Sequence, residues 1–429
     1  MKKFLVFSVV FVTTTLFYAS CQKEDAVVTS DVSTAVKSEV QTSKKLHVSY
    51  KDAIQIATEA VAILEGDAQT RSAVKRRVDL SKVKYHVTPQ TRSGEGGDTL
   101  YYVVNYADSA GFALVSTTRA DGDPLIAVTE LGNYTPGEET GNPGFDMYID
   151  LLNSRIDNRP PTIDTTFNGF GPFYDYEILE ESEVEPMLVV RWGQWYPYNE
   201  YSGSVSYPAG CVAVALAQIM SHYQYPTSFT RTHDDSHAIQ TLNWSAIKMY
   251  PNVLDCGLTN QHALAHLIRE IGEIADIDYD SSGSGTSDTK AVQSLFSFGY
   301  SLSATLQAYN LNRIHTELDN NRPVYMRGSY NNAPVGHAWV VDGYYYKFER
   351  VIEYYETGVG GDKTITNETP IITSHLHINW GEHGDGNGFY NAGVFDTDNY
   401  VQLDAGVEAL PNNEFNTLLQ IIVGITPNI

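Results

Sequence analysis

Cys211 is the residue whose sequence context points most directly to chemistry. It follows a Tyr-Pro-Ala-Gly loop at 207–210, and apolar residues then recur at helical spacing as far as Tyr223. This pattern predicts a cysteine in the first turn of a buried helix, where the helix dipole favours a thiolate over a thiol. Gly210 would let a substrate approach the sulfur closely. An unreactive core cysteine would give the same local pattern, so this segment alone does not decide between the two roles.

A thiolate nucleophile needs a base, and the base needs a residue that orients it. His337 lies in Gly-His-Ala-Trp-Val-Val at 336–341, and Asn379 lies in Leu-His-Ile-Asn-Trp-Gly at 376–381. Both segments predict apolar strands. The Asn379 carbonyl could accept the imidazole Nδ1 proton, and the Trp380 indole could shield that hydrogen bond from water. Taken singly, the histidine is better explained by a bond to a backbone carbonyl and the asparagine as a turn former.

The order of these residues along the chain is itself informative. His337 follows Cys211 by 126 residues and Asn379 follows it by 168. Papain-like proteases keep the order Cys, His, Asn and place the last two about 130–150 residues after the cysteine. The histidine fits this spacing, whereas the asparagine lies somewhat beyond it. The local cysteine signature of papain itself is absent.

Taken together, these segments resemble the streptopain family of secreted cysteine proteases. The resemblance covers nearly all of residues 185–429 and rests on Gly-Cys-Val-Ala at 210–213, Ala-Gln-Ile-Met at 217–220, Gly-His-Ala at 336–338 and Asn-Trp-Gly at 379–381. It implies that Cys211, His337 and Asn379 are catalytic, that Trp380 covers the His–Asn contact, and that neither a cofactor nor a metal is needed.

Two further segments extend this resemblance to the substrate cleft. Trp-Gly-Gln-Trp at 192–195 matches a family segment whose glutamine helps to form the oxyanion hole. The resemblance therefore implies that Gln194 and the Cys211 amide stabilise the developing negative charge. The stretch at 278–285, with Ser282 and Gly283, resembles the glycine- and serine-rich stretch near the family's cleft. Gly336, beside the histidine, is expected at the same cleft.

A smaller α+β unit precedes the catalytic segments. Apolar residues at helical spacing predict a helix over 49–64 with Ser49 as its cap, and short apolar runs predict strands at 83–87, 100–106, 112–116 and 124–128. Segments at 48–53, 101–105 and 111–116 resemble the streptopain propeptide, which implies that this unit inhibits the protease. We therefore expect an α+β fold, in which a papain-like protease with a helical part and an antiparallel sheet part follows a small α+β prodomain.

This organisation predicts five regions. We expect a signal peptide at 1–20, a tether at 21–46, the prodomain at 47–160, a linker carrying the activation cleavage at 161–185, and the catalytic domain at 186–429. Cleavage is expected between about 160 and 187, where turn-forming residues and acids gather. An insertion-like stretch at 347–370, between the histidine and asparagine strands, predicts a hairpin.

The N-terminus reads as an export signal. Two lysines precede an apolar stretch at 4–18 that is short for a membrane span. Tyr-Ala-Ser-Cys at 18–21 resembles a bacterial lipobox, which implies cleavage before Cys21 and a lipid on its sulfur. The sequence thus predicts an exported protein anchored by Cys21 in a bacterial membrane, the outer membrane being favoured. An ordinary signal peptide with an incidental cysteine is the alternative.

Composition excludes several classes of protein. A formal charge of −24 argues against a nucleic-acid binder, and 42% hydrophobic residues argue against a mostly disordered chain. Three cysteines are too few for a disulfide scaffold, although a Cys211–Cys256 bridge stays open. We interpret Cys256 as structural or incidental. One segment contains four residues of types that bind metals, namely His375, His377, His383 and Asp385. Beyond His375 and His377, no third ligand stands at a defined spacing, so no metal site is expected there.

The sequence favours a lipoprotein cysteine endopeptidase made as a zymogen. Its partners would be protein or peptide substrates, its own prodomain as inhibitor, and the membrane. The alternatives are a Cys–His amidase and an inactive binding or adhesion lipoprotein on the same fold. The joint presence of Gln194, Cys211, His337 and Asn379 weighs against the inactive protein. An inhibitor acting on another protease is disfavoured because a whole catalytic half follows in the same chain.

Overall fold

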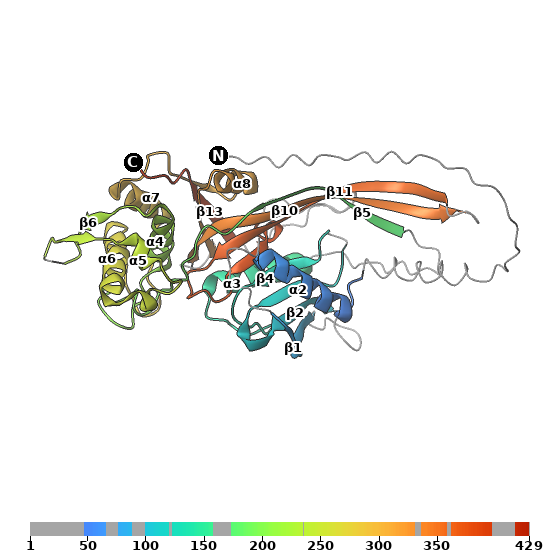
Figure 1. The fold of residues 1–429 in the computed structure, drawn as a ribbon, viewed down its shortest axis with the longest axis horizontal. Coiled ribbons are helices and arrows are strands. Elements are labelled where there is room, and N and C mark those ends of the chain that lie inside the picture. Colours follow the sequence, from blue (N-terminus) through green and yellow to red (C-terminus); the bar gives the residue numbers. More distant parts are fainter. Residues whose placement is uncertain are drawn as a thin grey trace, which may run out of the picture.

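The computed structural model describes residues 47–65, 76–87, 99–119, 122–157, 173–234, 236–330, 336–357, 362–396 and 417–428. These residues form a group of helices, a long antiparallel sheet and an N-terminal unit whose strands continue that sheet (Figure 1). The α+β fold class and its division into a helical part and an antiparallel sheet part are confirmed. Cys21 and the expected signal peptide lie outside the described residues. Within these ranges, no helix is both long and apolar enough to cross a membrane.

The helical part is built around the helix that begins at Cys211. Residues 212–221 of this helix, α4, are all buried, which its small alanine and valine side chains permit. The surrounding helices share one hydrophobic core with it. The elements of this part are α4 (Cys211–Tyr223), β6 (Ser228–Thr230), β7 (Ile239–Thr241), α5 (Trp244–Ile247), η2 (Val253–Cys256), α6 (Leu258–Ile274) and α7 (Asp288–Ser297).

The sheet part holds the predicted histidine and asparagine strands side by side. β10 and β11 pair antiparallel along almost their whole length, with Val340 opposite Asn379. The predicted hairpin at 347–370 is the outer half of this pair and projects from the body as an arm (Figure 1). The elements are β8 (Thr305–Ala308), α8 (Leu311–Asp319), β9 (Val324–Tyr330), β10 (Gly336–Thr357), β11 (Asp362–Asn379), β12 (Gly388–Asn391), η3 (Ala392–Phe395) and β13 (Thr417–Val423).

The segment expected as a linker at 161–185 contains a strand. β5 (Phe173–Val184) pairs antiparallel with the outer part of β10, from Tyr354 back to Tyr344. Its many acidic residues hide the strand from a hydrophobicity pattern, since nearly all of its described side chains face solvent. The arm is thus three-stranded, with β5 along one edge.

The N-terminal unit has the predicted helix and strands. Ser49 and Asp52 cap the helix reciprocally, because the Asp52 carboxylate accepts from the Ser49 amide at 3.1 Å and the Asp52 amide donates to Ser49 Oγ at 3.3 Å. The helix buries its alanine face against its own strands. The elements are α2 (Tyr50–Glu65), β1 (Val78–Val87), β2 (Thr99–Tyr106), η1 (Ala107–Ser109), β3 (Phe112–Ser116) and β4 (Leu125–Thr129).

Two features join this unit to the catalytic part. The sheet continues across the boundary, because β4 pairs with β12 through Thr129 opposite Gly388. A second helix, α3 (Pro143–Asp157), shares a hydrophobic core with β10 and β11 rather than with α2. The strand order in the described part of the chain is β1-β2-β3-β4-β12-β11-β10-β9-β13-β8, with β5 beside β10.

Candidate active site

Cys211 occupies the first residue of α4, as predicted. The preceding Gly210 has φ +90°, a backbone conformation that favours glycine. A Cβ at Gly210 would lie 3.0 Å from Ile277 Cδ1 and 3.4 Å from the Ser284 carbonyl oxygen. The glycine- and serine-rich stretch therefore lies directly beside the cysteine loop, as the expected cleft requires.

The expected cleft residues lie around this point in different environments. Ser282 and Gly283 are exposed at the tip of their loop. Gly336 begins β10 against β9, where a Cβ would lie 2.8 Å from the Gly328 carbonyl oxygen and 3.3 Å from an Arg327 nitrogen. The backbone at Gly336 thus leaves no room for a side chain next to the histidine.

His337 lies at the start of β10 and is buried. Its Nε2 lies 2.8 Å from the backbone oxygen of Trp380, to which it donates. Ala338, the next residue, packs in the same core as α4. Its backbone N–H donates toward the Cys211 sulfur, an interaction that favours the thiolate. Among the described residues, however, no hydrogen bond joins His337 to Cys211 or to Asn379. The structure brings the predicted residues together without forming the predicted triad bonds.

Asn379 is held by other partners. Its side-chain oxygen accepts from Gln218 Nε2 at 3.0 Å and from the Gly381 amide at 3.2 Å. Its side-chain nitrogen donates to the Val190 carbonyl oxygen at 2.7 Å. These contacts fix which way the amide faces, with its oxygen toward α4 and the amide of Gly381. Gln218, on the buried face of α4, is therefore a positioning residue for Asn379.

Gln194, the predicted oxyanion donor, is already engaged. Its side-chain nitrogen donates to Glu382 Oε1 at 2.7 Å. Glu382 follows Trp380 by two residues, in a loop held against the Gln194 segment by the His383 amide, which donates to the Trp192 carbonyl oxygen at 3.2 Å. The donor that an oxyanion would use therefore faces a carboxylate in this structure.

The start of α3 lies against the same residues. A Cβ at Gly144 would lie 2.5 Å from a ring carbon of Trp380 and 2.7 Å from His337 Cδ2, so only glycine fits there. The helix is fixed at this end by Asn142, whose side chain accepts from the Phe145 amide at 3.1 Å and donates to the Asp385 carbonyl oxygen at 3.2 Å. The N-terminal unit thus places its backbone directly on the buried face of His337 and Trp380.

The electrostatics of the site disfavour an ion pair in this state. Burial raises the pKa of the Cys211 thiol, outweighing the opposing effects of the Ala338 amide and the Arg327 charge. Burial also lowers the pKa of His337, outweighing the Glu382 carboxylate that favours its charged form. The thiolate expected from the helix dipole is therefore not favoured here, because desolvation is the larger effect.

The other cysteine and the histidines of β11 have structural partners. Cys211 and Cys256 are both free, and Cys256 Sγ lies 3.3 Å from the Ile247 carbonyl oxygen. His375 Nε2 lies 2.9 Å from the Leu125 carbonyl oxygen, while His377 Nδ1 lies 2.6 Å from Asp342 Oδ1. The two histidines therefore do not share a ligand site.

His377 also faces the N-terminal unit. Its Nε2 lies 3.5 Å from Glu130 Oε1, and Glu130 pairs with Arg191 at 2.6 Å. Burial alone would lower the pKa of His377, but the Asp342 and Glu130 carboxylates outweigh it and raise the pKa to about 9. A buried charge of the catalytic part thus depends partly on a residue of the N-terminal unit.

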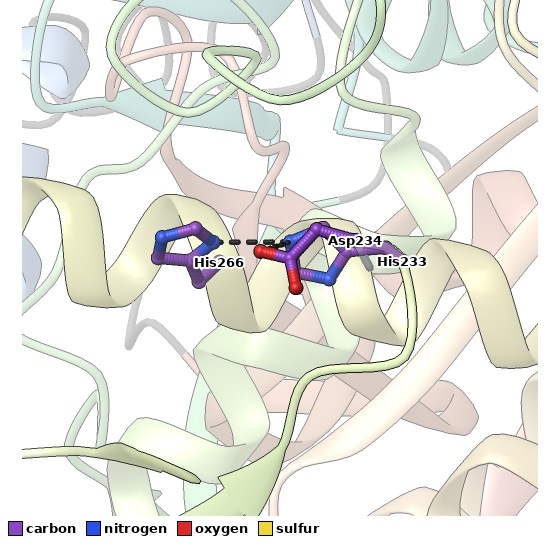
Figure 2. A group of neighbouring side chains, drawn as sticks. All are labelled: His233, Asp234 and His266. Carbon is purple, nitrogen blue, oxygen red and sulfur yellow. Dashed lines mark hydrogen bonds and ion pairs between the residues drawn. The ribbon is translucent and has the colours of Figure 1, made fainter. Parts of the chain in front are cut away.

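A separate cluster of His233, Asp234 and His266 has three ligand-type atoms within 4.8 Å of one another (Figure 2). Arg231 Nη1 donates to His266 Nε2 at 2.8 Å, so the His266 proton is on Nδ1 and is donated to His233 Nε2 at 3.0 Å. His233 Nδ1 then donates to Glu270 at 2.7 Å. A metal on His266 Nδ1 would put a proton on Nε2, against Arg231. Hydrogen bonds therefore account for this cluster.

Several residues that contact the site were not predicted from the sequence. The α3 helix carried a usable signal, since Asn142-Pro143 is a typical helix start and apolar residues follow at helical spacing. Gln218 carried none beyond its place in a segment that resembles the family. Glu382 and Glu130 carried none, because their partners are far away in the sequence.

Comparisons with known proteins cover the segment that carries this site. Residues 192–390 match the model of the peptidase C10 family. The chain is 25% identical over 335 residues to the thiol protease/hemagglutinin PrtT of Porphyromonas gingivalis, spanning 70% of this chain but only 35% of that protein. It is 24% identical over 414 residues to streptopain of Streptococcus pyogenes, spanning 86% of this chain and 90% of streptopain. The catalytic segment, residues 192–390, thus matches the peptidase C10 family, and the relatives of the chain are the cysteine peptidases streptopain and PrtT.

Proposed function

We propose that the chain is a cysteine endopeptidase made as a self-inhibited zymogen, with Cys211 as nucleophile and His337 as its base. The observation that carries the proposal is the packing of α3 against the catalytic histidine: Gly144 leaves no space between the helix backbone and the ring of His337. A prodomain that merely assisted folding would not need to reach this ring. Its position there is what an inhibitory segment requires.

Two hydrogen bonds and the burial of two groups would keep this form latent. His337 donates its Nε2 proton to the Trp380 carbonyl oxygen, and among the described residues no hydrogen bond joins its ring to Cys211. Gln194 donates to Glu382 instead of to a substrate oxygen. Burial beneath α3 favours a neutral imidazole, and burial likewise favours a neutral thiol at Cys211. Departure of α3 would admit water and substrate, and would remove the packing that holds the ring in this orientation.

The released site would hydrolyse a peptide bond in two stages. His337, oriented by the Asn379 oxygen, takes the Cys211 proton, and the thiolate attacks the carbonyl carbon. Gln194 and the Cys211 amide stabilise the oxyanion, and the imidazolium then gives its proton to the leaving amine. Water, with its proton taken by His337, hydrolyses the acyl-enzyme and restores the thiol. Trp380 covers the His–Asn contact.

Activation would require a cut between the two units. The sequence places it between about 160 and 187. Paired strands must be unzipped before they can enter a protease cleft as an extended segment, and β5 is paired with β10 throughout Phe173–Val184. We therefore expect the cut on the N-terminal side of Phe173, so that β5 stays with the catalytic part.

The place of action is proposed from the N-terminus. Export and lipid attachment at Cys21 would tether the zymogen to a bacterial membrane, and activation would release the catalytic part from the tether. Cys21→Ser in the producing cell should shift the unprocessed chain from the membrane fraction to the soluble fraction. An unchanged distribution would remove the lipid anchor from the proposal.

Self-processing tests the catalytic proposal directly. Residues 22–429 would be expressed as wild type and as Cys211→Ala and followed by mass spectrometry under reducing conditions. We expect wild type alone to yield a fragment of about 30 kDa from the 47.6 kDa chain, blocked by a thiol-directed epoxide. If both chains stay intact, each would be trimmed with an external protease. Failure of the trimmed wild type to cleave casein would then favour an inactive binding protein.

A further inference from the structure

Glu382 is a carboxylate placed between two working groups of the proposed site. It accepts from Gln194 Nε2 at 2.7 Å. It is also the charge that most opposes the effect of burial on the pKa of His337, so it lies close enough to act on the imidazole. Its own side chain is half-buried, with part of its surface open to solvent. No step of the two-stage reaction described above uses the Glu382 carboxylate.

The loop that carries Glu382 is rigidly held, so its position is not incidental. The His383 ring lies so close to Gly193 that a Cβ there would be 2.4 Å from the ring. The preceding Gly381 has φ +76° and donates its amide to Asn379. The loop is thus fixed to the oxyanion segment at one point and to the catalytic asparagine at another.

The chemistry of the reaction decides which part of the substrate meets this carboxylate. The scissile carbonyl oxygen must point at Gln194, and the leaving amine must lie beside His337, which protonates it. The residue after the scissile bond therefore lies on the side of His337. Because Glu382 contacts Gln194 and acts on His337, it borders the position of that residue.

On this basis, which rests on the proposed function, we propose that Glu382 is a specificity-determining residue that selects lysine or arginine immediately after the scissile bond. A half-buried carboxylate attracts an ammonium or guanidinium group more strongly than an exposed one does. A basic side chain would also draw Glu382 away from Gln194. The oxyanion donor would then be freed by the substrate itself.

The preference for a basic residue is tested with the activated enzyme and three peptides. The peptides differ only in the residue after the scissile bond, which is Lys, Ala or Glu. Active enzyme is counted by titration with a thiol-directed epoxide. We expect wild type to prefer Lys over Glu by about tenfold or more in kcat/KM, and Glu382→Gln to lower this ratio to within about twofold of unity. The ratio is taken within each enzyme, so a change in Gln194 that affects all substrates equally cancels.

Asp385→Asn is the matched control, because it removes one negative charge from an exposed position three residues along the same loop. It should retain most of the preference. The inference would be overturned if both variants lost the preference for Lys over Glu equally. It would also be overturned if the wild-type ratio of kcat/KM for Lys over Glu were near one. A ratio near one would follow if Arg191, released from Glu130, paired with Glu382 instead. If wild type is labelled by the epoxide but cleaves none of the peptides or casein, the endopeptidase proposal itself fails.

Discussion

The two long helices of the N-terminal unit, α2 and α3, have different tasks. α2 buries its alanine face against β2, β3 and β4, the strands of its own unit. α3 buries its apolar face in a core that the protease sheet shares with β2, β3 and β4, and its first turn lies on His337 and Trp380. One helix therefore packs mainly within its own unit, while the other also reaches the buried histidine of the catalytic part. A change in α2 should act through folding, whereas a change in α3 should act on the site.

The largest expected effect is that of Gly144→Leu. The new side chain would have to occupy space that the rings of Trp380 and His337 fill, so the start of α3 must lift. We expect self-processing, and alkylation of Cys211 before any cut, to be faster by about a hundredfold. Mass spectrometry of the Cys211 peptide at short reaction times would measure the alkylation.

Ala57→Leu is the matched change in α2, since Ala57 is fully buried in the core of the N-terminal unit. Overpacking there should lower the stability of that unit by about 1–3 kcal/mol. Well below its melting temperature, however, alkylation of Cys211 should stay near the wild-type rate. If the two variants accelerate alkylation equally, the division of tasks between the helices is wrong.

A smaller effect is expected at Glu130, which reaches from the N-terminal unit to Arg191 and His377. Because the pKa of His377 is raised to about 9, its charge stabilises the folded chain fully below the ordinary pKa of about 6.5, and this contribution is lost as pH rises through 9. Glu130→Gln should therefore cost about 2 kcal/mol near pH 6 and less near pH 10.

Denaturant unfolding at pH 6, 7.5, 9 and 10 would measure this difference. Glu139→Gln, at an exposed position of the same unit, should cost little at any of these values. A cost for Glu130→Gln that does not vary with pH would show that its contact with His377 contributes nothing.

The smallest effect is expected at the start of α2. Ser49→Ala removes the hydroxyl that accepts from the Asp52 amide and should cost about 1 kcal/mol of the stability of the N-terminal unit. Thermal unfolding would measure this cost. The rate of Cys211 alkylation should not change, and an acceleration would mean that α2 also governs access to the site.

The sequence predicted the parts of the site that depend on local pattern. Cys211 begins α4, His337 lies at the start of β10 and Asn379 ends β11, because periodicity and turn residues determine these positions. The observed arrangement of the site was not predictable in the same way. It depends on contacts between distant segments, such as Gln194 with Glu382, and on burial, which reverses the expected ionisation of Cys211.

If the proposed activation removes the N-terminal unit, the shared sheet has a consequence for the catalytic part that remains. While the N-terminal unit is in place, the outer side of β12 is paired with β4 through Gly388, Phe389 and Tyr390. Loss of that unit would leave a strand with unpaired amides and carbonyls, the kind of edge at which sheets recruit foreign strands. Because β12 is only four residues long, this edge offers little length for aggregation. The same three pairing positions are where a detached N-terminal unit would return in register, so under the proposed function the removed unit would still be able to bind the enzyme.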